Sequence, residues 1–216
     1  MDVKRFLPLG GVAAVAVVVF AVAVLGGNTP GNDASGAEVA SYYDAHQARE
    51  IAAAFLLAAS APLLVIFGAS LAGALWASEA EAARRPVWEL VLLAGSALAA
   101  GAFVVAAFLT FALADVPTKL GADALQALNV LDNDVWVTFN SGLGVMMLGA
   151  GGSLLARTRL YRWLGWAALA LGIALFIPFV DFVALLLSGV WILVTSVTLF
   201  RERAEAQYAA APRMAS

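Results

Sequence analysis

The sequence predicts an all-α membrane protein, a bundle of six transmembrane helices that occupies residues 1–216 as a single domain. Hydrophobic residues make up 63% of the 216 residues and charged residues only 12%, about half the share found in soluble domains. The apolar residues fall into six long runs, and the basic residues gather between alternate runs. Such a chain cannot cover a water-facing surface, so we expect it to lie in a lipid bilayer.

Each apolar run approaches the roughly 20 residues that a helix needs to cross a bilayer. The expected helices cover about residues 6–25, 51–76, 87–113, 135–156, 163–177 and 182–200. The first run exceeds the roughly 7–15 apolar residues of a secretory signal, so we expect a retained helix. Pro62 predicts a kink in the second helix. The fourth helix is rich in glycine and serine, which predicts close helix packing at the centre of the bundle.

The last two helices are expected to form a hairpin. Residues 163–200 carry one charge, Asp181, and as one helix they would extend roughly 57 Å, far beyond a hydrocarbon layer of about 30 Å. We therefore expect a tight outer turn over residues 177–181, in which Asp181 caps a helix or, alternatively, contacts a proton or cation. Glu89, in the first turn of the third helix, is expected to match the helix dipole.

The distribution of basic residues predicts the orientation. Ten of the 12 lysine and arginine residues lie on one side of this six-helix topology: Lys4, Arg5, Arg84, Arg85, Arg157, Arg159, Arg162, Arg201, Arg203 and Arg213. Only Arg49 and Lys119 lie on the other side. Because cytoplasmic loops are enriched in such residues, we expect both termini to be cytoplasmic and the protein to lie in the inner (plasma) membrane.

Two outer segments are expected to form short amphipathic helices at the membrane surface, before the second and fourth spans. Ser35 and Glu38 have the spacing of a capping box, which predicts a helix start near Gly36. One face of that helix would carry Val39, Tyr42, Tyr43 and His46. In the segment 118–134, leucines recur at a helical period.

Few residues carry recognisable chemistry. The chain has no cysteine, its two lysines lie outside the expected spans and its one histidine is His46, which excludes thiolate sites, a retinal Schiff base and bis-histidine haem. His46 with nearby carboxylates could bind a divalent cation, or it could be an interfacial residue. Asn140 lies in the fourth helix, where its amide must face another helix or a ligand. We expect no catalytic residue, bound metal or cofactor, and nothing supports nucleic-acid binding.

Several stretches are similar to a group of uncharacterised bacterial integral membrane proteins of roughly this length. They are residues 25–30, 38–46, 127–134 and 162–166, and the similarity extends over nearly the whole chain. The resemblance implies a six-helix fold and no catalytic residue. It also suggests that the two outer segments form one site together. Its candidate residues are Tyr42, Tyr43, Asp44, His46, Asn129, Asp132 and Asp134.

Three functions fit these observations. The short loops and the near absence of intramembrane ionisable groups favour a non-catalytic envelope subunit that binds the bilayer and another membrane protein or a second copy of itself. A carrier of a small molecule, lipid or ion is the first alternative, which the kink at Pro62 and the polar outer face permit. A membrane enzyme with an outward His46 and acidic site is the second.

Overall fold

The computed structural model describes residues 6–77, 87–115, 117–157 and 161–210, except for the side chains of residues 77, 157 and 206–210, and they contain helices joined by turns and loops. The elements are the 3-10 helix η2 (Leu7–Leu9), α1 (Gly10–Val19), the π-helical η3 (Phe20–Gly26), α2 (Gly36–Ala77), α3 (Val87–Asp115), α4 (Ala122–Asp134), α5 (Trp136–Arg157), α6 (Arg162–Ala174) and α7 (Asp181–Ala210). In this part of the chain five segments are long and apolar enough to cross a membrane: 7–26, 36–76, 87–115, 122–156 and 181–205.

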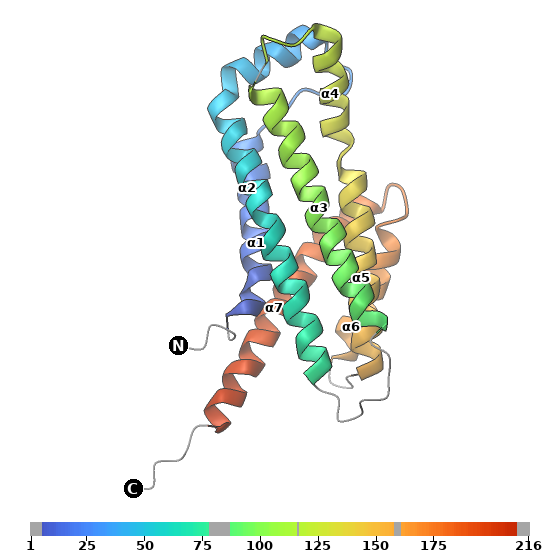
Figure 1. Cartoon of the computed structure of the whole chain (residues 1–216). Helices are drawn as coiled ribbons and strands as arrows, with labels where there is room; N and C mark the ends of the chain where they lie inside the picture. Colours follow the sequence, from blue (N-terminus) through green and yellow to red (C-terminus); the bar gives the residue numbers. More distant parts are fainter. Residues whose placement is uncertain (1–5, 78–86, 116, 158–160, 211–216) are drawn as a thin grey trace, which may run out of the picture.

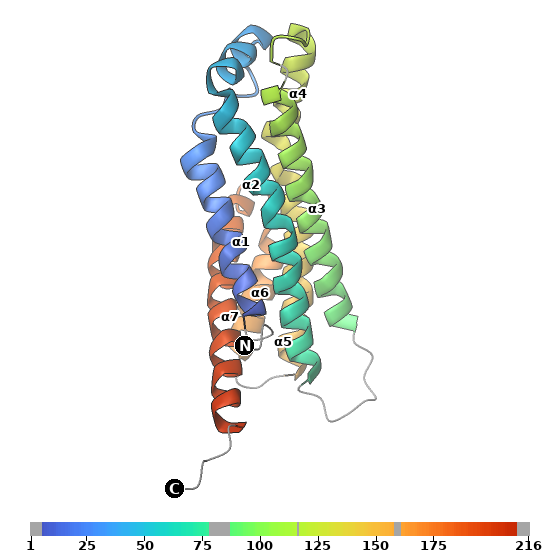
Figure 2. The same cartoon turned by 60° about the vertical axis from the view of Figure 1, so that its left-hand side comes forward.

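The helices run side by side as an elongated bundle (Figures 1 and 2). We call the end that carries η2 and the last turns of α7 the base, where the rings of Phe6 and Phe200 lie 6.0 Å apart. We call the opposite end the cap, which consists of α4 and residues 36–46 of α2. The first and last described helices therefore meet at one end of the bundle (Figure 1). This is the arrangement expected when a chain runs along a bundle an even number of times.

Helix α5 lies between α3 and α6, and glycines on both of its sides make this possible. A Cβ atom on Gly142 would lie 2.3 Å from the backbone nitrogen of Ala99, and one on Gly149 would lie 2.2 Å from that of Leu92. On the other side, a Cβ on Gly151 would lie 2.8 Å from the carbonyl oxygen of Gly165. Two backbones can approach this closely only where side chains are absent, so the predicted central place of this small-residue helix is confirmed.

The predicted helix start near Gly36 is also confirmed, and its capping box forms. The Ser35 backbone N–H and hydroxyl donate to the Glu38 carboxylate over 2.7 and 2.8 Å, and the Glu38 N–H faces the Ser35 hydroxyl at 3.4 Å. The expected short helix before the span is present, but it meets the next helix at His46 and not at residue 51. The two helices of α2 join at a kink at His46, whose φ and ψ are −120° and 15°, and helical geometry resumes directly after it.

The two outer helices pack on each other and form a second, smaller core. It consists of Val39, Tyr43, Leu113, Ala114 and Leu125, all buried. Gly36 begins α2 so close to α4 that a Cβ there would lie 2.0 Å from the carbonyl oxygen of Ala122. The apolar face of residues 36–46, expected at the membrane surface, therefore packs against the end of α3 and against α4. Packing between helices removes this apolar surface from water just as contact with lipid would.

Helices α6 and α7 form the predicted antiparallel hairpin, in which the Trp191 indole donates to the carbonyl oxygen of Leu164 over 3.0 Å. The expected bounds were wrong: α6 ends at Ala174, before residue 177, and α7 continues to Ala210, past residue 200. The 13 residues of α6 rise about 20 Å, less than a hydrocarbon layer of about 30 Å. The sixth crossing stays a prediction.

Candidate functional site

The turn between α6 and α7 packs against α5, level with the middle of α3. A Cβ on Gly144 would lie 2.6 Å from the ring of Phe176, just before the turn, and one on the neighbouring Gly142 would touch Ala99 of α3. Because α3 runs from Val87 to Asp115, Ala99 is close to its midpoint. Figure 1 shows the same relation, with the α6–α7 turn well below the cap. The turn is therefore set back from the tip of the cap, and its expected place on the outer side of the membrane stays a prediction.

The side chains of the turn explain this depth. Phe179 is 98% exposed, and Phe176, Ile177 and Val180 are also exposed. A turn in water is normally built from glycine, asparagine, aspartate and serine, whereas these side chains suit contact with lipid. Pro178 ends the helical pattern, and Phe179 takes a φ of 70°, a left-handed conformation that costs a non-glycine residue roughly 1–3 kcal/mol. The chain therefore reverses within the apolar height of the bundle.

Asp181, the first residue of α7, forms a buried pair with Asn140 of α5. The Asn140 amide nitrogen donates to an Asp181 carboxylate oxygen over 2.9 Å, and the two residues are 4% and 7% exposed. The amide oxygen of Asn140 is buried without a hydrogen-bond partner among the described residues. Since buried polar atoms are nearly always paired, this oxygen is an acceptor that is available to a ligand.

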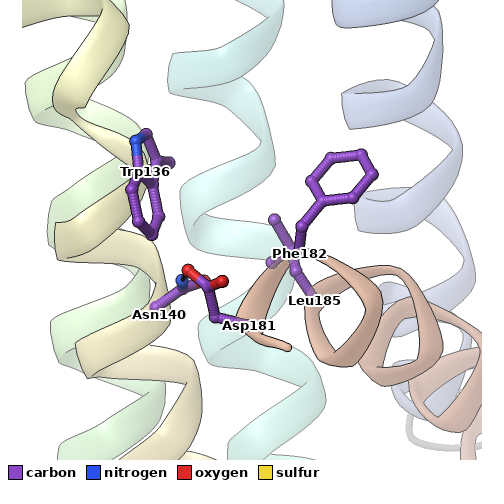
Figure 3. A pocket seen from close by; sticks show the side chains of 5 residues that line it. All are labelled: Trp136, Asn140, Asp181, Phe182 and Leu185. Carbon is purple, nitrogen blue, oxygen red and sulfur yellow. Dashed lines mark hydrogen bonds between the residues drawn. The ribbon is translucent and has the colours of Figure 1, made fainter. Parts of the chain in front are cut away.

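A cavity of about 200 Å³ opens beside the pair, lined by Trp136, Asn140, Asp181, Phe182 and Leu185. In Figure 3 the Asp181 carboxylate and the Asn140 amide lie together, with the Trp136 ring on one side and Phe182 and Leu185 on the other. Trp136 and Phe182 are 43% and 65% exposed, so aromatic rings border the cavity on its outer side. The polar lining offers carboxylate and amide oxygens, which are ligands for protons and hard cations.

The position of Asp181 at the start of α7 has a structural role as well. A carboxylate in the first turn of a helix interacts favourably with the helix dipole, and the N–H of Asp181 itself bonds the carbonyl oxygen of Ile177 over 3.1 Å. The cap role that the sequence predicted is therefore compatible with its place. It does not explain the adjacent cavity or the unpaired oxygen of Asn140, because a helix cap needs neither.

Asp132 is the centre of the polar contacts in the cap. It is partly buried and accepts a hydrogen bond of 3.0 Å from the Thr110 hydroxyl at the end of α3. Burial raises the pKa of Asp132 to about 6, and the charge of Glu50 acts in the same direction, whereas the hydrogen bond from Thr110 and the nearby Tyr43 hydroxyl lower the pKa. Of the residues proposed for an outer site, Tyr43 and Asp132 therefore lie together.

His46 and Tyr42 lie together at the kink of α2, and the Tyr42 ring also packs edge to face on Tyr43, with 5.2 Å between the ring centroids. Their rings lie 4.5 Å apart, and the His46 Nδ1 is 2.8 Å from the carbonyl oxygen of Tyr42. The Tyr42 hydroxyl lies 2.9 Å from the carboxylate of Glu50 and 2.7 Å from a guanidinium nitrogen of Arg49. The described residues contain no group of three or more histidine, aspartate or glutamate side chains that could hold a metal ion.

The remaining outer candidates hold loops in place or face outward. Asn129 donates to the carbonyl oxygens of Pro30 and Gly31 over 3.2 and 2.9 Å, and Asp134 accepts from Asn32 over 3.2 Å. Asp44 is exposed. Asn129 and Asp134 thus tie the loop before α2 to α4, and the seven predicted residues are divided among several local contacts.

Sequence reasoning missed two features of the molecule. It did not connect Asp181 with Asn140, although the apolar run before Asp181 was too short for a full crossing and the turn lacked polar residues. It also did not single out Glu50, which is 1% exposed and is paired with Arg49 over 3.1 Å. A carboxylate next to an arginine at the start of an apolar run was the available signal.

The fold and site thus define an all-helical bundle, compatible with a membrane protein, that encloses a paired carboxylate and amide at mid-height. No family model, curated protein or solved structure matches the chain. The resemblance to the bacterial group therefore stays a prediction, and the functional argument depends on this chain's own residues.

Proposed function

We propose that the chain is a small non-catalytic membrane carrier whose transported or coupling ion, a proton or a monovalent cation, binds between Asn140 and Asp181. The observation that carries this proposal is the buried Asp181 carboxylate, which lines a cavity between α5 and the start of α7. Ionisable residues at such a depth are costly and usually mark ion or proton pathways. Carriers also commonly use interrupted helices near the middle of the bilayer, and the α6–α7 turn supplies an interruption of this kind.

The packing of α5 weakens the case for an envelope subunit. The sequence favoured that function partly because small residues in a membrane helix often bind a partner helix. Here Gly142 and Gly149 meet α3, and Gly144 and Gly151 meet α6, so these glycines serve contacts within the chain. A partner protein or a homo-oligomer remains compatible with a carrier, and the lipid bilayer is its surrounding partner.

Six helices in the inner (plasma) membrane, with both termini cytoplasmic, form part of the same proposal. The excess of arginine and lysine toward the base supports a cytoplasmic base, and the cap then faces outward. In this placement α6 and α7 enter from the cytoplasmic side and return to it. The Asn140–Asp181 pair would lie within the hydrocarbon layer.

The enzyme alternative receives less support. It required His46 to meet Asp132 or Asp134 in a cavity, whereas the contacts of His46 in the described chain go to Tyr42. The acidic and aromatic side chains of the cap instead connect α2, α3 and α4. We therefore assign the cap a structural role around Asp132 and Glu50, and no cofactor enters the proposal.

Transport in proteoliposomes tests the carrier. Purified protein is reconstituted in vesicles that contain a pH-sensitive dye. Gradients of protons, Na⁺ and K⁺ are imposed in separate experiments, so that each cation is tested by itself. We expect wild-type protein to dissipate at least one gradient and Asp181→Asn, which keeps the shape and removes the charge, to lose at least tenfold in rate. Asp123→Asn, on the exposed face of α4, is the matched control and should keep wild-type flux.

Two results would overturn the proposal. Wild-type vesicles that dissipate no gradient faster than empty vesicles would exclude ion transport of this kind. Equal rates for wild type and Asp181→Asn would assign the carboxylate to helix capping alone. Circular dichroism and size-exclusion profiles of each variant establish that it is folded before its rate is compared.

A further inference from the structure

Helix α7 carries three buried hydroxyl groups toward the interior of the bundle. Ser188 and Ser196 are 0% exposed and Thr195 is 2% exposed. Within the described part of the chain, none of the three hydroxyl oxygens has a hydrogen-bond partner. Because an unpaired buried hydroxyl is costly, three of them along one helix call for an explanation.

Other hydroxyl groups in the same bundle do form a hydrogen bond, to a backbone carbonyl oxygen of their own helix. Thr198, on the same helix, donates to the carbonyl oxygen of Val194 over 2.8 Å, and Ser96 of α3 donates to that of Leu92 over 2.8 Å. Serine and threonine in membrane helices commonly bond the carbonyl four residues earlier. The three inward hydroxyls of α7 do not, so their hydrogen-bonding capacity is directed into the bundle.

Two of these hydroxyls, those of Ser188 and Thr195, belong to a line of polar residues along α7 that begins at the proposed ion site. Asp181, Ser188, Thr195 and Glu202 recur every seven residues, which places them near one face of the helix. Each interval rises about 10 Å along the helix. In Figures 1 and 2, α7 runs from the middle of the bundle to the base, and the line therefore connects these two levels.

A second cavity lies where this line reaches the base. It has a volume of about 180 Å³, and its polar lining comes from Tyr161, Thr195, Thr198 and Glu202. The Tyr161 hydroxyl donates to the Glu202 carboxylate, so a hydrogen-bonded pair borders this cavity as Asn140 and Asp181 border the first. Its volume is sufficient for several water molecules, and its polar groups can bind them.

We propose that water molecules bound along Ser188 and Thr195 form a proton path between Asp181 and the cavity at Tyr161 and Glu202, and so to the base. This inference rests on the proposed function and identifies the coupling ion as a proton. The proton would pass between water molecules: each accepts one on its oxygen and releases another to the next acceptor, the last transfer protonating the Asp181 carboxylate. Water is the donor and the acceptor of every step except the last, in which a water molecule donates to the Asp181 carboxylate; the first proton comes from water at the base, so no other reactant is needed.

Cysteine accessibility tests the path, and the chain has no cysteine of its own. Ser188→Cys and Thr195→Cys are each reconstituted and treated with a membrane-impermeant methanethiosulfonate reagent added from either side, because such reagents modify thiolates that contact water. Val190→Cys and Val197→Cys are the matched controls, since both valines lie on α7 and are exposed on the outside of the bundle, at 54% and 39%. We expect modification of the two path positions from the base side, at least tenfold faster than of either control.

Equal modification rates at the path and control positions would overturn the water path. A second readout is proton flux: Thr195→Val should slow it, and Thr195→Ser should preserve it. If the path cysteines are inert while Asp181→Asn still abolishes transport, the path fails and the proposed carrier stands. If the path cysteines react while Asp181→Asn transports normally, the carrier fails and the water-filled track stands.

Discussion

At the residue scale, the molecule separates two kinds of carboxylate by their surroundings. Asp181 receives one hydrogen bond from a neutral amide and lies beside a cavity. Asp132 lies in the cap and Glu50 lies next to the cap in α2, where a threonine and an arginine respectively compensate them. The first arrangement leaves an acceptor free for a ligand, whereas the second uses its acceptors to join helices.

Asp132 makes the stability of the cap depend on pH. Its pKa is about 6 in the folded chain against 3.8 for an ordinary aspartate. Below about pH 4 the carboxyl is protonated in both states, and between the two values the folded state retains a proton that the unfolded chain releases. The free energy of unfolding should therefore fall as pH rises through this window, by at most about 3 kcal/mol.

Thermal unfolding in detergent between pH 4 and pH 8 measures this effect. Asp132→Asn, which is neutral throughout, should flatten the decline and unfold at a higher temperature than wild type at pH 7. Asp123→Asn should retain the wild-type profile. An Asp132→Asn profile that coincides with wild type at every pH would show that Asp132 does not titrate in this window.

At the element scale, glycines determine how closely the helices approach. Gly142 and Gly149 face the backbone of α3, whereas Gly101, on α3 itself, has no other atom within 4 Å of the position a Cβ would take. The sequence could predict that α5 is central, because small residues cluster there. It could not predict which glycines form contacts, because that depends on the rotation of each helix about its axis.

Alanine substitution should distinguish these two kinds of glycine. Gly142→Ala must separate α5 from α3, and we expect it to cost roughly 1–3 kcal/mol through overpacking. Gly101→Ala should be neutral or should stabilise by about 0.5–1 kcal/mol, since it reduces the entropy of the unfolded chain without a clash. Chemical denaturation of the two variants in micelles compares them, and equal effects would contradict the packing described for α5.

At the scale of the whole molecule, the hairpin of α6 and α7 is the feature that sequence reasoning recovered only in part. The run 163–200 was too long for one crossing, so the turn itself was predictable. Its depth was not, because hydrophobicity along the chain does not show how far a hairpin rises beside its neighbours. That information lies in the contacts of Phe176 with Gly144 and of Asp181 with Asn140.

The depth of the turn can be measured directly with Phe179→Cys. Phe179 is fully exposed on the bundle, yet we expect an impermeant maleimide to leave this cysteine unlabelled from either side, because the turn lies among lipid chains. Asp123→Cys in the cap and Glu205→Cys at the base are exposed controls that should each label from one side. Rapid labelling of Phe179→Cys from the cap side would place the turn at the outer surface.

Infrared difference spectroscopy of reconstituted protein tests the central claim, that Asp181 reversibly binds a cation inside the bundle. Spectra are recorded while pH and the concentration of Na⁺ or K⁺ are varied. The account predicts a carboxyl or carboxylate band that responds to pH or to the cation, that is absent in Asp181→Asn and that persists in Asp123→Asn. Wild-type and Asp181→Asn difference spectra that coincide under all these conditions would contradict it and leave Asp181 as the N-terminal residue of α7 with a structural role only.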